Sequence, residues 1–120
     1  DYSSKLFKLY DIMNLTDFEN VISADRSLLV DFYATWCGPC RAIRSVLDAF
    51  VERMGGEVEL LPIDVDHYEN QQLVDHYRIM SVPTLILFRE GRILWRNSGV
   101  ITLENLLDVI RQLERTEAYY

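Results

Sequence analysis

Apolar residues along the chain recur at two different spacings in turn, which predicts strands alternating with helices. Short apolar runs bounded by turn residues predict five strands, at Leu6–Tyr10, Ser27–Ala34, Val58–Val65, Leu85–Phe88 and Ile93–Trp95. Apolar residues three and four positions apart predict helices between them. The expected helices begin near Thr16, follow the turn at Thr35–Pro39 as far as about Met54, span Glu69–Tyr77, and begin after Thr102.

Local signals mark where these helices start and stop. Thr16 with Glu19 three residues later forms a capping box, and Thr102 is placed to cap the last helix. Glycine is common at helix C-termini, so Gly55 and Gly56 should end the second helix. The apolar stripe expected to be buried on that second helix consists of Ile43, Val46, Leu47, Phe50, Val51 and Met54.

The order of the elements predicts the fold class. Strand–helix–strand units give parallel pairing, and the hairpin turn at Glu90-Gly91 adds antiparallel strands. We therefore expect an α/β fold with a central mixed five-stranded sheet and four helices packed on both faces. Sheets of this kind carry function at the carboxyl ends of their strands. The turn that holds both cysteines lies at such an end.

Length and composition limit the function classes. A chain of 120 residues with 49% hydrophobic residues fits a single domain spanning residues 1–120. Twelve Lys and Arg against 19 Asp and Glu give a net charge of −7, with no basic patch of the kind that nucleic-acid binders use. The acidic balance favours a monomer. Apolar runs of about five residues fall far short of the roughly 20 needed to cross a bilayer, so no membrane insertion is expected.

The start of the chain bears on its location. No cationic segment followed by an apolar run is present, which argues against a signal peptide within these residues. We therefore expect a cytoplasmic protein. Because the first residue is Asp1 and not Met, a periplasmic or other extracytoplasmic location is the alternative.

The two cysteines lie between a predicted strand and a predicted helix, in the run Cys37-Gly38-Pro39-Cys40. Free N–H groups and the positive dipole end of a helix N-terminus favour a thiolate, which lowers the pKa expected for Cys37 and makes it a nucleophile. Cysteines three apart at a helix start are also close enough for a disulfide. Pro39 is tolerated because first-turn residues need no N–H donor. The pattern favours a redox-active dithiol.

Two other interpretations of the cysteine pair are weaker. As a structural disulfide it would close a loop of only four residues, which contributes roughly 2 kcal/mol. As half of a zinc site it would need four ligands in all, and His67 and His76 are the only histidines. No bound metal is expected.

The residues around the cysteines carry a family resemblance. The stretch Thr35-Trp36-Cys37-Gly38-Pro39-Cys40, preceded by Leu29–Ala34, resembles the active-site segment of the thioredoxin family. The resemblance covers about residues 6 to 115 and continues through Asp64-Val65-Asp66, Val82-Pro83-Thr84, Phe88-Arg89-Glu90-Gly91 and Gly99.

This resemblance implies a thioredoxin fold and a protein-disulfide reductase. By analogy Cys37 attacks a substrate disulfide and Cys40 resolves the mixed disulfide, by ordinary thiol–disulfide exchange. No bound cofactor is implied beyond the redox-active Cys37–Cys40 disulfide. The implied partners are protein disulfide substrates and a flavin-containing thioredoxin reductase that uses NADPH, or another dithiol donor.

The resemblance also assigns roles to further residues. Asp31 lies in an apolar strand, where burial should raise the pKa of its carboxyl, and the family uses this acid to shuttle protons to the resolving cysteine. The family has a cis proline at the position of Pro83, and the backbone before it pairs with substrate as an added strand. The residues implied for the active-site loop and for substrate docking are Trp36, Gly38, Pro39, Val82, Pro83 and Gly99.

Some positions depart from the family pattern. Pro62 stands where the family usually has a lysine near the buried acid, Ser45 replaces a helix-kinking proline, and Arg41 replaces a frequent lysine. Two alternatives to a general reductase stay open. One is an extracytoplasmic reductase or isomerase supplied by a membrane dithiol partner, and the other is an adaptor that uses the same fold only for binding.

Overall fold

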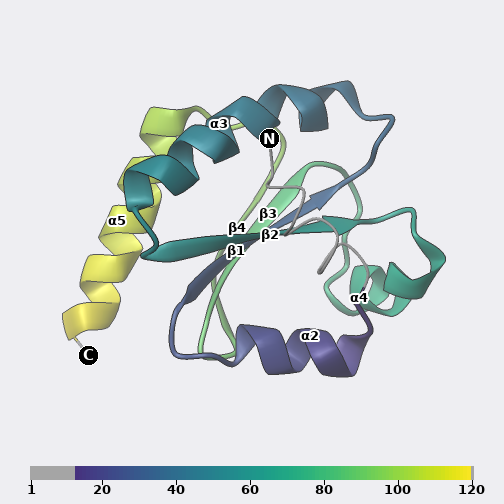
Figure 1. The fold of residues 1–120 in the computed structure, drawn as a ribbon, viewed down its shortest axis with the longest axis horizontal. Helices are drawn as coiled ribbons and strands as arrows, with labels where there is room; N and C mark the ends of the chain where they lie inside the picture. Colours follow the sequence, from purple (N-terminus) through teal and green to yellow (C-terminus); the bar gives the residue numbers. More distant parts are fainter. Residues whose placement is uncertain (1–12, 120) are drawn as a thin grey trace.

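The computed structural model describes residues 13–119, which form a sheet covered by helices (Figure 1). The strands are β1 (Ser27–Tyr33), β2 (Val58–Asp64), β3 (Thr84–Arg89) and β4 (Arg92–Ser98). The helices are α2 (Leu15–Ile22), α3 (Gly38–Met54), α4 (Gln71–His76) and α5 (Leu103–Tyr119), with a short 3-10 turn η1 (Tyr68–Asn70) before α4. The helix predicted over Glu69–Tyr77 is thus divided between η1 and α4.

The sheet has the strand order β2-β1-β3-β4. Strand β1 pairs in parallel with β2 and antiparallel with β3, and β3 pairs antiparallel with β4. The mixed sheet is confirmed, but the expected count of five strands is wrong, because residues 13–119 form a sheet of four. The fifth strand was assigned to Leu6–Tyr10, which lies outside the described residues. That assignment depended on one short apolar run, and such a run does not by itself distinguish a strand from other structure.

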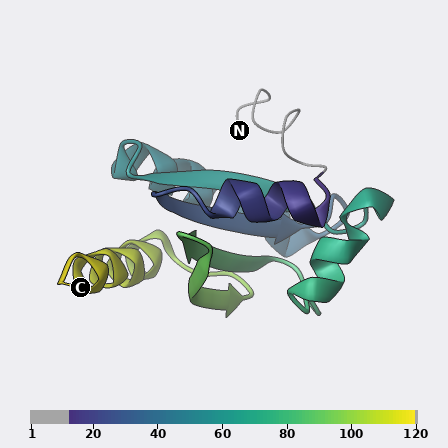
Figure 2. The same cartoon turned by 90° about the horizontal axis from the view of Figure 1, so that it is seen from below.

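Alternating side chains of the strands build two separate cores. Leu29 of β1 belongs to the core beneath α3 and α5, together with Leu85 and Leu87 of β3. The neighbours Leu28 and Val30 belong to the opposite core, which is covered by α2 and α4. Figure 1 shows α3 and α2 on opposite sides of the sheet, and the view from below places α4 and α5 at opposite ends of the molecule (Figure 2). The expected placement of helices on both faces is confirmed.

The ends of the helices follow the predictions in two cases out of three. Gly55 ends α3 with a left-handed φ of 56°, and Thr102 Oγ1 accepts a hydrogen bond from the Asn105 N–H at 3.2 Å. The Thr16 capping box is wrong, because Asn14 is the N-cap and its side chain accepts from the Asp17 N–H at 2.8 Å. Asparagine caps helices at least as well as threonine does. The helix therefore begins after Asn14, two residues before Thr16.

The apolar stripe predicted for α3 is confirmed at four of its six positions, whereas Val46 is only partly buried and Val51 is exposed. Ile43, Leu47, Phe50 and Met54 are buried, whereas Val51 is 36% exposed. A helix turns by about 100° per residue, so Val51 falls at the margin of the face that Leu47 and Met54 define.

Within residues 13–119, no helix combines the length and apolar character needed to cross a bilayer.

Candidate active site

A disulfide joins Cys37 to Cys40 at the N-terminus of α3. Cys37 is the N-cap residue, and its Sγ accepts a hydrogen bond from the Cys40 N–H at 3.1 Å. The two sulfurs are buried, since the exposed fractions are 3% for Cys37 and 2% for Cys40. A backbone N–H and the dipole of a seventeen-residue helix therefore point at the Cys37 sulfur. This geometry favours the thiolate form when the disulfide is reduced.

The chain reaches this position directly from the central strand. Strand β1 ends at Tyr33, and a turn closed by the Cys37 N–H and the Ala34 carbonyl at 3.3 Å leads into α3. Pro39 occupies the first turn of α3, where no N–H donor is missed. Beyond its chain neighbours, no atom of the described residues lies within 4 Å of the position that a Cβ on Gly38 would occupy. The cysteine pair is therefore built by local strand–turn–helix geometry that the sequence predicts.

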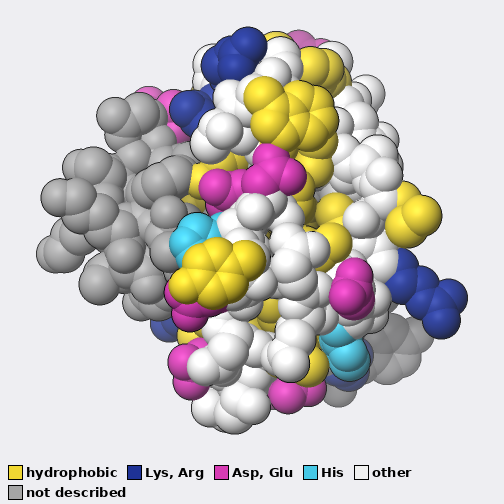
Figure 3. All heavy atoms as spheres, turned by 90° about the vertical axis from the view of Figure 1, so that its right-hand side faces the viewer, with side chains coloured by type: hydrophobic (Ala, Val, Ile, Leu, Met, Phe, Trp, Pro, Cys, Tyr) yellow, Lys and Arg dark blue, Asp and Glu magenta, His cyan; other side chains and the backbone are white. Residues whose placement is uncertain are grey.

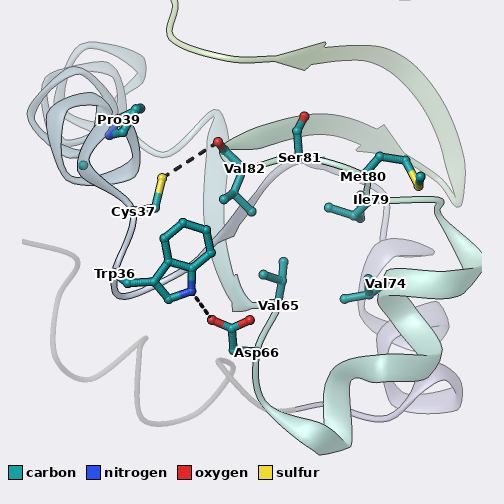
Figure 4. A pocket seen from close by; sticks show the side chains of 11 residues that line it. Trp36, Cys37, Pro39, Val65, Asp66, Val74, Ile79, Met80, Ser81 and Val82 are labelled. Carbon is teal, nitrogen blue, oxygen red and sulfur yellow. Dashed lines mark hydrogen bonds between the residues drawn. The ribbon is translucent and has the colours of Figure 1, made fainter.

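A second loop approaches the sulfurs from β3. The Val82–Pro83 peptide bond is cis, which confirms the cis geometry expected at Pro83. The Val82 carbonyl oxygen lies 3.8 Å from Cys37 Sγ, and the close-up view shows this contact as a dashed line (Figure 4). Gly99, with a φ of 96°, donates its N–H to the Pro83 carbonyl at 2.8 Å. The loops that hold Cys37, Pro83 and Gly99 therefore meet at one end of the sheet.

Trp36 is the exposed residue of the cysteine loop, with 68% of its surface accessible. Its indole Nε1 donates a hydrogen bond to Asp66 Oδ2 at 2.6 Å, and Figure 4 shows the ring lying between Cys37 and Asp66. Asp66 is itself placed by its backbone N–H, which donates to Asp64 Oδ1 at 2.9 Å. Sequence reasoning quoted Asp66 only within a family motif and assigned it no role. Its position just after β2, at a carboxyl strand end, was the available signal.

A groove of about 640 Å³ runs from the cysteines toward α4. Its lining residues are Trp36, Cys37, Gly38, Pro39, Val65, Asp66, Val74, Ile79, Met80, Ser81 and Val82. Met80 is 90% exposed, so an apolar side chain stands in water at the rim of the groove. The face of the molecule on this side shows a band of hydrophobic side chains with acidic ones beside it (Figure 3). Sequence reasoning missed Val74, Ile79 and Met80.

Asp31 lies in the interior and not in the groove. It is 1% exposed, in the middle of β1, directly opposite Pro62 of β2 and Leu85 of β3. By strand alternation it shares its face with Leu29, which places it on the side of the sheet that α3 covers. Pro62, one of the positions that depart from the resembled pattern, is therefore its cross-strand neighbour. Asp31 is brought beneath the helix that begins with the cysteines.

Other titratable residues near the site make local contacts. His67 Nδ1 accepts a hydrogen bond from the Glu69 N–H at 3.2 Å, and the His67 ring stacks on Tyr68. Among residues 13–119 no group of three or more histidines, cysteines and acids is arranged to hold a metal ion. The chemistry that the described site offers is that of two sulfurs beside an apolar groove.

Comparisons with known proteins agree with this geometry. A family model described as thioredoxin matches residues 10–112. A thioredoxin of Alicyclobacillus acidocaldarius is 46% identical over 82 residues, which covers 67% of this chain and 76% of that protein. A thioredoxin of Staphylococcus epidermidis is 40% identical over 95 residues, covering 79% of this chain and 88% of the relative.

Solved structures give the same result for the fold. The oxidised mitochondrial thioredoxin 3 of Saccharomyces cerevisiae superposes with a TM-score of 0.76 at 28% identity, over 89% of this chain and 97% of that one. A chloroplastic thioredoxin z superposes with a TM-score of 0.75 at 32% identity, over 88% of this chain and 95% of that one.

Proposed function

The chain belongs to the thioredoxin family and is a protein-disulfide reductase with a Cys37–Cys40 redox pair, and on this premise we propose how its residues divide the reaction. The redox group is the disulfide itself, and thioredoxins bind no further cofactor. The observation that carries the proposal is the position of Cys37, which is both the N-cap of α3 and a lining residue of the groove.

Cys37 is the attacking residue in this proposal. In the reduced protein its thiolate forms a bond to one sulfur of a substrate disulfide, and the substrate S–S bond breaks. The displaced substrate sulfur leaves as a thiolate and takes up a proton. Cys40 then attacks Cys37 Sγ, which restores the Cys37–Cys40 disulfide and releases the second substrate sulfur. Two electrons pass to the substrate, and two protons end on its thiols.

Asp31 is the proposed proton carrier for the second half of this exchange. The Cys40 thiol must lose its proton before its sulfur attacks, and Asp31 lies beneath the helix that carries Cys40. A buried carboxyl resists ionisation, because burial disfavours the charged form. Such a group takes a proton at a pH where an exposed aspartate would not.

The groove and the cis-proline loop are the proposed docking surface. The Val82 carbonyl faces Cys37, and an extended substrate segment placed along it would add backbone hydrogen bonds in the manner of an added strand. Trp36, Gly38 and Pro39 line the groove on the side of the cysteines, and Val82 lines it on the side of the cis-proline loop. Pro83 and Gly99, which are hydrogen-bonded to each other, lie beside the groove and complete the proposed docking surface. The exposed apolar surface of Trp36 and Met80 favours substrates with apolar residues beside the disulfide.

The oligomeric state, substrates, reductant and location of the protein are also proposals. We propose that residues 1–120 act as a single domain and a monomer, that the substrates are protein disulfides, and that the reductant is a flavin-dependent thioredoxin reductase using NADPH. The cytoplasm is the matching location. An extracytoplasmic location would replace that reductase by a membrane dithiol donor.

The reduction potential of the Cys37–Cys40 pair tests the direction of this chemistry. Equilibration with glutathione or dithiothreitol buffers, followed by thiol counting, should give a value near the roughly −270 mV of a reducing thioredoxin. A value near about −180 mV or −120 mV is that of isomerases and oxidases. Such a value would contradict the reductase assignment.

A further inference from the structure

Three arginines converge on a pocket at the end of α3 that is remote from the cysteines. The pocket has a volume of about 410 Å³ and is lined by Arg53, Met54, Glu57, Arg111 and Arg115. Arg53 comes from the last turn of α3, and the other two arginines come from α5. Figure 1 shows the end of α3 beside α5, at the opposite end of α3 from the loop that leads into it from β1.

The charge of this pocket opposes that of the whole protein. The chain has a net charge of −7, yet the pocket lining holds three cations and one carboxylate, Glu57. Other arginines find acids nearby: Arg26 lies 3.1 Å from Glu59, and Arg89 lies 3.6 Å from Asp25. Among the side chains that the structure describes, which leave out those at positions 114 and 116–119 of α5, no ion pair of 4.0 Å or less involves an arginine of the pocket.

A bound anion would offset the repulsion among the three arginines, which are all exposed. Arg111 and Arg115 are four residues apart, so their side chains are neighbours on one face of α5, where like charges repel. A cation in the last turn of a helix is stabilised by the helix dipole, which accounts for Arg53. The dipole of α3 gives no reason for two more cations from another helix at the same place.

The shape and the donors of the pocket define a ligand class. Arginine offers a planar fork of N–H donors that matches phosphate oxygens in pairs, and its charge persists at any physiological pH. Met54, which is 5% exposed, supplies an apolar lining surface next to these donors. We propose that this pocket binds a phosphate-bearing anion with at least two negative charges.

This binding site is separate from the redox site. Arg53 lies sixteen positions after Cys37 along α3, which corresponds to roughly 24 Å of helix at about 1.5 Å per residue. The pocket shares no lining residue with the groove beside the cysteines. The ligand therefore occupies a second site, and its binding does not require the cysteines to be in either redox state.

The proposal is tested by titrating the oxidised 120-residue chain with pyrophosphate and following its backbone and arginine side-chain NMR signals. Sodium chloride replaces pyrophosphate at matched ionic strength in the reference series, so that general screening is subtracted. The expected result is a saturable set of shifts confined to residues 53–57 and to the Arg111–Arg115 turn. Shifts of equal size at arginines over the whole surface would overturn the proposal.

Substitutions sharpen this test. The double variant Arg111→Gln with Arg115→Gln should weaken pyrophosphate binding by about tenfold or more, because it removes charge-assisted hydrogen bonds. The double variant Arg26→Gln with Arg92→Gln changes the net charge equally and should bind as the parent does. Glu57→Gln should tighten binding, since it removes the carboxylate beside the anion. If the two double variants lose affinity equally, or Glu57→Gln weakens binding, the site is not the one proposed.

The source of the phosphate is resolved by two further probes. Inorganic phosphate and ATP are titrated under the same conditions. If pyrophosphate binds more tightly than phosphate, and ATP binds as tightly as pyrophosphate, the site takes free polyphosphate. Tighter binding of ATP than of pyrophosphate, with added shifts around Met54, identifies a nucleotide ligand. Absence of saturable binding for all three probes would show that these arginines form only a hydrated face.

Discussion

The indole Nε1 of Trp36 donates a hydrogen bond to Asp66 Oδ2 at 2.6 Å, which ties the cysteine loop to the segment after β2. Trp36 is 68% exposed, so this single bond is a main restraint on a large ring at the surface. Both residues line the groove. The bond therefore holds one wall of the groove beside Cys37.

Asp66→Ala should weaken substrate docking. Loss of the acceptor frees the Trp36 ring, and a net hydrogen bond of about 1 kcal/mol corresponds to roughly a fivefold rise in KM for a protein disulfide substrate. Steady-state kinetics measure this change, with kcat expected to stay close to the parent value. Asp66→Asn keeps an acceptor oxygen and is the matched control. A fall in kcat without a change in KM would contradict the docking role.

Cys40→Ser should trap the reaction half-way. Cys37 still attacks, but no resolving sulfur remains, so a mixed disulfide with the substrate accumulates and is visible by mass spectrometry under non-reducing conditions. Cys37→Ser should form no adduct and show no reductase activity. Serine is a good N-cap, so Cys37→Ser should keep α3 folded. An adduct carried by Cys40 in the Cys37→Ser variant would reverse the two roles.

Asp31→Asn should slow the step in which Cys40 resolves the mixed disulfide. The substitution keeps the shape of a side chain that is 1% exposed but cannot accept the thiol proton. General acid–base groups contribute about 100-fold or more, so at least a tenfold loss is expected near pH 7. Stopped-flow measurement of resolution across pH should show a weaker pH dependence in the variant. Identical kinetics at every pH would remove Asp31 from the reaction.

Pro62→Lys should move the pH profile of that same step. Pro62 lies directly opposite Asp31 in the parallel pair of β1 and β2. An ammonium group there would favour the carboxylate form of Asp31, so the midpoint of the resolution profile should shift to lower pH. Pro62→Met has a side chain of similar length without charge and should leave the midpoint unchanged. An equal shift in both variants would mean that the backbone change, and not the charge, is responsible.

Tyr77 should make stability depend on alkaline pH. Burial, and then the nearby Glu19 carboxylate, raise the pKa of Tyr77 above its usual 10.0 in the folded protein. The folded state therefore holds this proton more tightly than the unfolded state. Its contribution to stability is complete below about pH 10 and is lost as the pH rises through the folded pKa. Urea unfolding should show a smaller loss of stability above pH 10 in Tyr77→Phe than in the parent protein.

The features that could be predicted from the sequence are those set by residues close along the chain. The strand, turn and helix around Cys37 and Cys40 depend on one apolar run, a Gly-Pro pair and a helical stripe, and the structure has all three. The burial of β1 on both faces was predicted in the same way, and all seven of its residues are buried. Neighbouring residues therefore contain enough information to place the redox pair.

Features that depend on distant segments could not be predicted. Met80 and Val74 line the groove only because the loop before β3 and helix α4 come together beside the cysteine loop. The bond between Trp36 and Asp66 joins residues thirty positions apart. The Asn14 cap was missed for a local reason, because asparagine and threonine both cap helices and both stand near the start of α2.

Gly38, between the cysteines, has open space around the position of a Cβ, and its backbone is not left-handed. Neither steric hindrance nor backbone strain therefore requires glycine there. A side chain at this position would lie next to the sulfurs with the rest of the fold undisturbed. The scaffold therefore leaves the residue between the cysteines free to vary, so one substitution can place new chemistry beside the redox pair without rebuilding the protein.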